Sequence, residues 1–181
     1  VPRRSGSARV SPPVQVVVVM GVSGSGKTTV AQALADAWPA TFLDADDFHS
    51  AAAKARMARG EPLTDRMRAP WVRRLRTELV RQTLVGGRVV LAFSGLRRQH
   101  RDALRAAGLP LKFIFLHGDR ALIAARMQAR SNHYMPASLL DSQFAALQDP
   151  RGEADVVTLE IDTTPNEILA RARSLVSITQ D

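Results

Sequence analysis

The sequence predicts an α/β protein in which a five-stranded parallel sheet is flanked by helices. Short apolar runs alternate along the chain with longer amphipathic segments, the pattern of strand–helix–strand units. The apolar runs are continuous and rich in β-branched residues, as in strands buried on both faces. A glycine-rich segment, residues 21–28, joins the first apolar run to the amphipathic segment after it. The 181 residues suffice for one domain with a sizeable core.

The first half of the chain alternates between strands and helices. A proline suits the first turn of a helix, so the third helix is expected to begin at Pro70, and Gly86-Gly87 ends it. The expected strands are Val14–Met20, Thr41–Leu43 and Val89–Phe93. The expected helices are Thr28–Trp38, Ala51–Ala58 and Pro70–Val85.

The second half continues the alternation. Gly108 and Pro110 end its first helix, and a polar break over Ser131–Pro136 separates the next two. The expected helices are Arg97–Ala107, Arg120–Arg130, Ala137–Leu147 and Asn166–Ile178. The expected strands are Leu111–Leu116 and Val156–Ile161.

Composition limits the compartment and the partners. Residues 1–13 are expected to form a flexible tail, and residues 14–181 a single domain. No apolar stretch reaches the roughly 18 residues of a membrane-spanning helix, and cysteine is absent, which excludes disulfides and thiolate metal sites. We therefore expect a cytoplasmic protein with no membrane partner. The net charge of +8 comes mainly from arginine, which suits phosphate and carboxylate but is also frequent in high-GC genomes.

The glycine-rich segment has the spacing of the Walker A phosphate-binding loop, Gly-x-x-x-x-Gly-Lys-Thr. Glycines let the backbone wrap around phosphate oxygens, and the helix that follows adds its positive end. Lys27 can reach the β- and γ-phosphates, and the Thr28 hydroxyl can bind Mg²⁺. A P-loop NTPase fold is therefore expected. The expected ATP-binding residues are Gly21, Val22, Ser23, Gly24, Ser25, Gly26, Lys27, Thr28 and Thr29.

An acidic turn follows the second expected strand. Asp44 and Asp46 lie two residues apart and share one face of an extended segment. We expect Asp44 to bind the metal through water, and Asp46 to accept a proton from a substrate hydroxyl. The alternative is that these acids cap a helix, a role that suits Asp47 best. His49 is a candidate substrate contact or a plain polar surface residue.

Five longer segments carry a more specific pattern. They are Met20–Ala31, Phe42–His49, Gly60–Trp71, Ser94–Arg105 and His133–Phe144. Together they resemble the gluconokinase family of shikimate-kinase-like P-loop kinases. The resemblance covers about Val16 to Asp162. Two positions depart from the family pattern: an expected Asn is Ala53 and an expected Asp is Met67. Both lie in the helices expected on the substrate side, where they remove polar groups that could bind sugar hydroxyls.

The resemblance implies a reaction and its cofactors. ATP and Mg²⁺ would serve the phosphorylation of D-gluconate to 6-phospho-D-gluconate in gluconate utilisation, feeding the pentose phosphate route. It also implies a mobile lid at about 126–140 and an assembly that in this family is often a homodimer. No nucleic-acid partner is expected.

Arginines supply the remaining candidate site residues. Arg97, Arg101 and Arg105 form one helical stripe; the first two could bind the substrate carboxylate, as could Arg68, whereas Arg105 is expected at the solvated surface. The alternative for this stripe is a salt-bridged face. Related kinases bring lid arginines onto the transferred phosphate, so Arg126 and Arg130 are expected to be catalytic together with Lys27 and Asp46. Their alternative is an exposed helix end.

Two other functions remain open from the sequence alone. Ala53 and Met67 leave room for a kinase that acts on another small sugar acid or on a shikimate-like hydroxy acid. The basic charge leaves room for a nucleotide-dependent nucleic-acid-binding module. Against the module, the chain has only nine aromatic residues, Phe 6, Trp 2 and Tyr 1, for base stacking.

Overall fold

The computed structural model describes residues 13–129 and 137–177 and contains one parallel sheet of five strands in the order β2-β3-β1-β4-β5. The strands are β1 (Val16–Met20), β2 (Thr41–Asp44), β3 (Val89–Ala92), β4 (Leu111–His117) and β5 (Val156–Glu160). Val16 in the central strand lies opposite Val89 of β3 and Leu111 of β4. The predicted fold class is confirmed, and each strand lies within one or two residues of its expected place.

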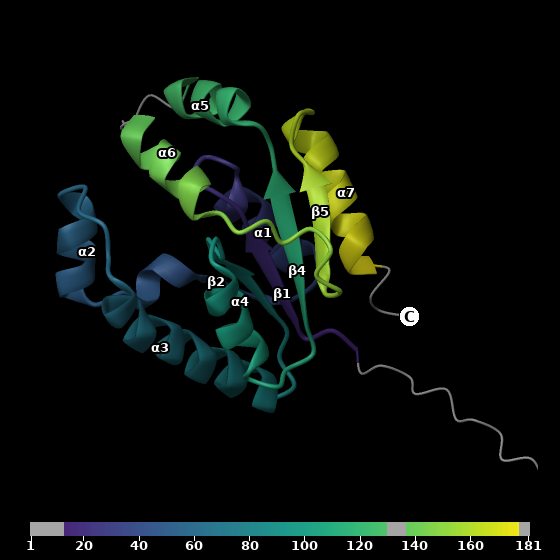
Figure 1. The fold of residues 1–181 in the computed structure, drawn as a ribbon. Coiled ribbons are helices and arrows are strands. Elements are labelled where there is room, and N and C mark those ends of the chain that lie inside the picture. Colours follow the sequence, from purple (N-terminus) through teal and green to yellow (C-terminus); the bar gives the residue numbers. More distant parts are fainter. Residues whose placement is uncertain (1–12, 130–136, 178–181) are drawn as a thin grey trace, which may run out of the picture.

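Helices cover both faces of the sheet (Figure 1). The helices are α1 (Lys27–Ala37), η1 (Ala45–Phe48, a 3-10 turn), α2 (Ala51–Ala58), α3 (Asp65–Leu84), α4 (Arg98–Arg105), α5 (Arg120–Ala129), α6 (Ala137–Ala146) and α7 (Pro165–Ser177). Val17 and Val19 of β1 pack in the core beneath α1 and α7, whereas Val18 and Met20 face the core beneath α3 and α4. This alternation explains why all five residues of β1 are apolar and buried. None of the helices in the described residues is long and apolar enough to cross a membrane.

The start of α3 differs from the sequence prediction. The helix begins at Asp65, five residues before Pro70, because the Thr64 hydroxyl caps it by accepting the Met67 backbone N–H at 3.3 Å. Pro70 therefore lies inside the helix and not at its first position. This longer α3 brings Asp65 and Arg68 to the carboxyl-terminal side of the sheet.

A buried ion-pair cluster joins α4 to the loop before β5. Arg101 is fully buried; its guanidinium donates to the Gly95 carbonyl at 2.7 Å and forms a double hydrogen bond with Glu153. Arg105 pairs with Asp155 at 2.7 Å and with Glu153. The expectation of a solvated Arg105 is therefore wrong, since three carboxylates surround a side chain that is only 24% exposed.

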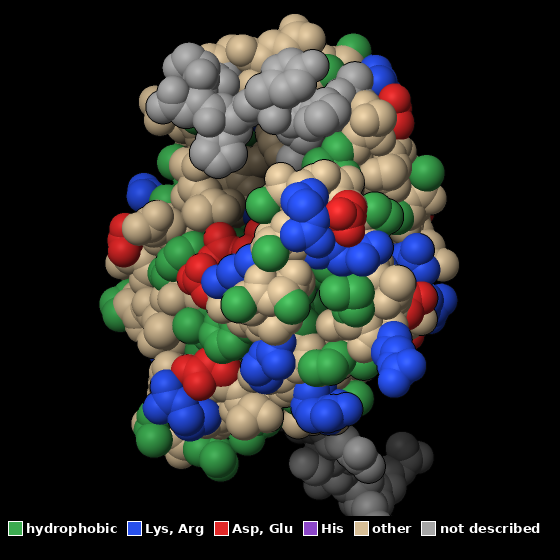
Figure 2. All heavy atoms as spheres, turned by 90° about the vertical axis from the view of Figure 1, so that its left-hand side faces the viewer, with side chains coloured by type: hydrophobic (Ala, Val, Ile, Leu, Met, Phe, Trp, Pro, Cys, Tyr) green, Lys and Arg blue, Asp and Glu red, His purple; other side chains and the backbone are tan. Residues whose placement is uncertain are grey.

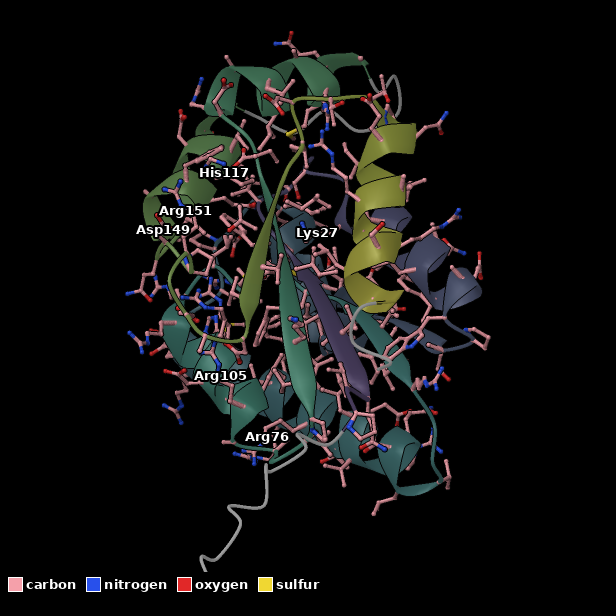
Figure 3. The ribbon with its side chains drawn as sticks, turned by 90° about the vertical axis from the view of Figure 1, so that its right-hand side faces the viewer. Lys27, Arg76, Arg105, His117, Asp149 and Arg151 are labelled. Carbon is pink, nitrogen blue, oxygen red and sulfur yellow. The ribbon has the colours of Figure 1, made fainter. Side chains whose placement is uncertain are left out.

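Replacing Glu153 with alanine should lower the free energy of unfolding by about 3–5 kcal/mol, because it leaves the buried Arg101 charge without its carboxylate. Urea unfolding followed by circular dichroism measures this loss. The matched control is Arg151→Ala, which breaks an ion pair with Asp149 at the surface visible in Figure 3. Both of these side chains are 53% exposed, so we expect Arg151→Ala to lower the free energy of unfolding by less than about 1 kcal/mol.

The Glu153 carboxylate also makes the free energy of unfolding depend on pH. The hydrogen bond from Arg101 lowers the pKa of Glu153 from 4.5 to about 2. The stabilisation from Glu153 is therefore present above pH 4.5 and lost as the pH falls toward 2. The difference in unfolding free energy between wild type and Glu153→Ala should shrink across this range. A constant difference would contradict the assigned ion pair.

Candidate active site

The phosphate-loop segment 21–28 connects β1 to α1, as the sequence predicted. Lys27 is the first residue of α1, so the amide groups of the first helical turn open toward the loop. Gly24 and Gly26 adopt φ angles of +81° and +98°, which residues with a side chain rarely take up. A Cβ at Gly24 would also lie 2.5 Å from Cγ of Met127 in α5. The loop is thus shaped by its glycines and packed under α5.

Lys27 lies across this loop. Its ammonium group donates a hydrogen bond to the Val22 carbonyl at 3.0 Å. Burial lowers the pKa of Lys27 to about 8, while Asp46 and Asp44 oppose this shift. The two carboxylates favour the charged form of the ammonium group, and its burial from water strengthens its attraction for an anion that arrives over the loop.

Asp44 links the phosphate loop to the acidic turn. One of its carboxylate oxygens accepts the backbone N–H of Asp46 at 3.0 Å and so caps η1. The other accepts the Thr28 hydroxyl at 3.4 Å. The cap that the sequence assigned best to Asp47 is therefore Asp44, which also lies beside the loop threonine. The two oxygen groups, one hydroxyl and one carboxylate, are of the hard type that Mg²⁺ prefers.

Asp46 and Asp47 project from the exposed side of η1. The pKa of Asp46 is raised, first because neighbouring residues partly shield the carboxyl from water and then by the Asp44 carboxylate, while Lys27 opposes the rise. The Asp46 side chain is 82% exposed, so solvent screens these effects. Asp46 is thus open to a substrate, and a raised pKa brings it closer to the working pH of a general base.

Helix α3 holds the acidic turn in place. The Trp71 indole donates to the Ala45 carbonyl at 2.6 Å, and the Arg74 guanidinium donates to the Phe48 carbonyl at 2.9 Å. His49 stacks on Trp71 with ring centroids 4.2 Å apart. Burial and nearby cations, Arg74 first among them, lower the pKa of His49 to about 4, so its ring is neutral at pH 7. Its Nε2 lies 3.8 Å from the Asp46 carboxylate.

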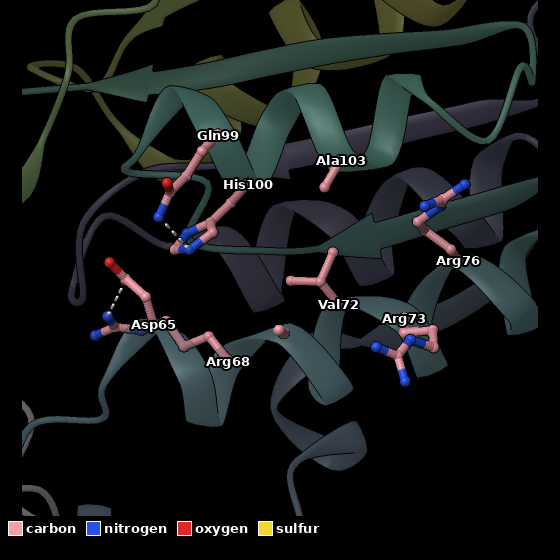
Figure 4. Close-up of a pocket in the computed structure, with 9 residues that line it drawn as sticks. Asp65, Arg68, Val72, Arg73, Arg76, Gln99, His100 and Ala103 are labelled. Carbon is pink, nitrogen blue, oxygen red and sulfur yellow. Dashed lines mark hydrogen bonds and ion pairs between the residues drawn. The ribbon is translucent and has the colours of Figure 1, made fainter.

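Arg68 and Arg97 meet at a shared carboxylate. Asp65 accepts Arg68 at 3.2 Å and Arg97 at 3.4 Å, and it comes from the first turn of α3. Asp65 and Arg68 lie at one end of a pocket of about 390 Å³ between α3 and α4, with His100 across from them (Figure 4). The structure therefore brings two of the three expected carboxylate-binding arginines together.

The remaining arginines have other partners. Arg101, the third expected carboxylate ligand, is fully buried and bound to Glu153, which gives it partners other than a substrate. Arg126 donates to the carbonyls of Ile161 and Thr163, the latter at 3.0 Å, at the end of β5. Arg130 and residues 131–136 of the expected lid lie outside the described residues.

Several contacts at the site were not predicted from the sequence. Asp65, Arg74 and Gln143 all touch residues that the sequence singled out, from positions far along the chain. Of these, Asp65 and Gln143 belong to segments of the family resemblance. The role of Asp65 as a bridge between two arginines, however, follows only from the packing of α3 against α4. Figure 2 shows one face of the molecule, with acidic side chains at the edge of a hollow and basic ones dispersed among them.

Comparison with known proteins gives consistent results. A family model described as an AAA domain matches residues 16–151. A gluconokinase of Gluconobacter oxydans is 40% identical over 153 residues, which cover 84% of this chain and 86% of that protein. A gluconokinase of Arabidopsis thaliana is 42% identical over 74% of this chain and 78% of its own length. The crystal structure of a gluconokinase from Sinorhizobium meliloti 1021 superposes with a TM-score of 0.84 at 38% identity, covering 92% of this chain and 93% of that one.

Replacing Gly24 with alanine should weaken the binding of a nucleoside triphosphate analogue and destabilise the fold. The positive φ costs about 1–2 kcal/mol, and the clash with Met127 adds about 1–3 kcal/mol. Gly152→Ala is the matched control, because its φ of +94° is similar but no atom lies within 4 Å of the new Cβ. Calorimetric titration and thermal unfolding measure the two effects.

Together the two variants should distinguish the effect of backbone strain at a positive φ from the effect of the contact between Gly24 and Met127. Gly152→Ala should lose stability but keep the wild-type affinity for the analogue. A Gly24→Ala protein that binds the analogue as tightly as wild type would show that the contact between the loop and α5 has no part in nucleotide binding.

Proposed function

The chain belongs to the gluconokinase family, and from this premise we propose how its residues carry out the ATP-dependent phosphorylation of D-gluconate. The products are ADP and 6-phospho-D-gluconate. The observation that carries the proposal is the contact of Thr28 with Asp44, 3.4 Å apart, because it joins the phosphate loop to the acidic turn. A phosphate donor and an alcohol acceptor can meet only where two such elements adjoin.

The nucleotide end of the site consists of the loop and the start of α1. Backbone amides from Gly26 to Thr29 bind the phosphates of ATP. The expected amides of Gly21, Ser23 and Ser25 are left out, because they already donate within the protein. Lys27 leaves the Val22 carbonyl and places its charge on the β- and γ-phosphates. Its positive charge stabilises the transferring group in the transition state.

Thr28 and Asp44 are the residues that would hold Mg²⁺. Within the described residues no group of three or more acidic or histidine side chains forms a closed metal site. That agrees with an ion held by few protein oxygens and completed by phosphate and water. When bound, Mg²⁺ supplies charge neutralisation for the phosphates.

Asp46 is the proposed general base. Its exposed carboxylate takes the proton from the primary hydroxyl of gluconate as that oxygen attacks the γ-phosphorus and ADP leaves. The neutral His49 ring, fixed by Trp71, offers a hydrogen bond to a neighbouring hydroxyl. The contacts from α3 to the turn keep Asp46 in place during the reaction.

Arg68 and Arg97 are the proposed partners of the gluconate carboxylate. They already share the Asp65 carboxylate, so the substrate would join or replace an existing anion. Arg101 supports them from the buried side, since it fixes the Gly95 and Leu96 carbonyls just before Arg97. This role replaces the direct substrate contact expected from the sequence.

The segment at about 126–140 is proposed as a lid that closes on the bound substrates and excludes water, which would otherwise hydrolyse ATP. Arg126 and Arg130 are its proposed cations. We further propose a single kinase domain over residues 14–181, a cytoplasmic location and a homodimer. Of the N-terminal tail expected from the sequence, residues 1–12 lie outside the described residues. On the face shown in Figure 2, basic side chains are interspersed with acidic ones, which supports a small-molecule enzyme over a nucleic-acid-binding module.

Release of ADP in a coupled assay tests the acceptor. The panel contains gluconate, shikimate and a few other aldonic acids at a fixed ATP concentration. Gluconate should give the highest kcat/KM. A higher value for another acid would move the assignment to that acid, and Ala53 and Met67 would then be the first residues to exchange.

Asp46→Asn should lower kcat for gluconate by about 10²–10⁴-fold, because the amide cannot take the proton. Asp47→Asn is the matched control, as the neighbouring acid is also exposed on η1 but has no proposed role in the reaction. We expect this control to keep near-normal turnover. An Asp46→Asn enzyme with normal kcat would remove Asp46 as the base while leaving the binding of ATP untouched.

A further inference from the structure

Gln143 in α6 makes a reciprocal pair of hydrogen bonds with the phosphate loop. Its side-chain oxygen accepts the Ser23 backbone N–H at 2.6 Å, and its side-chain nitrogen donates to the Ser23 hydroxyl at 2.8 Å. The two residues are 120 positions apart in the chain. We propose that Gln143 is a positioning residue that holds the phosphate loop in the shape that binds ATP. The inference rests on the proposed kinase function.

The chemistry of the pair explains why an amide is suited to this position. Ser23 presents one backbone donor and one hydroxyl, and an amide offers an acceptor and a donor to match them. A carboxylate would place a negative charge beside the phosphates, and an ammonium group could not accept the N–H. The neutral amide satisfies Ser23 without repelling the nucleotide.

The pair also fixes the direction of one loop amide. The Ser23 N–H points at α6 and is therefore not one of the phosphate ligands. The adjacent Gly24 is packed against Met127 and Ile123 of α5. Two successive loop residues are thus held by two helices, and the Ser25 N–H donates to the Val22 carbonyl at 3.2 Å. The amides that follow, from Gly26 onward, are left to face the phosphates. A loop held in this way loses less conformational entropy when ATP binds.

Helix α6 is itself anchored away from the loop. Gln148, just after the helix, accepts the Arg98 backbone N–H at 2.6 Å and donates its own N–H to the Leu96 carbonyl at 2.8 Å. Arg120 of α5 pairs with Asp141 of α6. These contacts do not involve Gln143, so a substitution there leaves α6 attached to α4 and α5. Its effect should therefore fall on the nucleotide and not on gluconate.

Gln143→Met tests the proposal, because methionine keeps the length of the side chain and removes the strong hydrogen bonds. We expect the Kd of a non-hydrolysable ATP analogue with Mg²⁺, measured by calorimetry without gluconate, to rise about three- to ten-fold. The KM for ATP should rise to the same extent, while kcat and the KM for gluconate stay at the wild-type values. Ser142→Ala is the control on the exposed side of α6, and it should change none of these constants.

A second variant keeps the test decisive if Gln143→Met folds poorly. Ser23→Ala removes the hydroxyl but keeps the backbone N–H, so it should raise the Kd of the analogue less than Gln143→Met does. In a folded double variant the two effects should not add, since they remove the same interaction. Additive effects, or full affinity in either single variant, would overturn the proposal.

A purely structural role for Gln143 would give a different result. Equal rises in both KM values together with a lower unfolding temperature would show that Gln143 only stabilises the fold, and would overturn the positioning role. A wild-type protein that binds the analogue but releases no ADP with gluconate would contradict the proposed function alone. The analogue measurement on Gln143→Met would still decide the role of Gln143.

Discussion

The parallel alignment of β1, β2 and β3 is the constraint on which the site depends. Parallel strands end at one edge of the sheet, so the loop after β1 and the acidic turn after β2 come together although β3 lies between their strands. The result is visible in one contact, the Thr28 hydroxyl on the Asp44 carboxylate. A different strand order would leave the phosphate loop without an acidic partner.

Helix α3 holds the acidic turn in the place that this alignment of strands gives it. Trp71 and Arg74 hold two carbonyls of the acidic turn, and Trp71 also carries the stacked His49. A short 3-10 turn has few hydrogen bonds of its own, so contacts from a neighbouring helix are needed to hold its carboxylates in place. The same helix supplies Arg68, so in the proposed mechanism α3 both supports the acidic turn and binds the substrate.

The buried ion pair between Arg101 and Glu153 has a structural role, on the side of α4 that packs against the loop before β5. Arg101 and Glu153 tie the start of α4, including the carbonyls before Arg97, to the loop before β5. Burial of such a pair is tolerated because every strong donor of the guanidinium has an acceptor nearby. Arg97 and Arg101 thus have different roles although they lie one helical turn apart on the same stripe.

The sequence by itself determined the fold class, the strands, the phosphate loop and the acidic turn, because these features depend on local spacing and on the burial pattern. The start of α3 differs from the prediction, because a proline fits the first turn of a helix but the cap at Thr64 begins this helix five residues before Pro70. Only the tertiary structure decided that Arg101 is buried, that Asp65 bridges Arg68 and Arg97, and that Gln143 holds Ser23. Apart from the contact of Asp65 with Arg68 in the same helix, these contacts join residues 32 to 120 positions apart. Their partners depend on how the helices pack on the sheet, which no local pattern encodes.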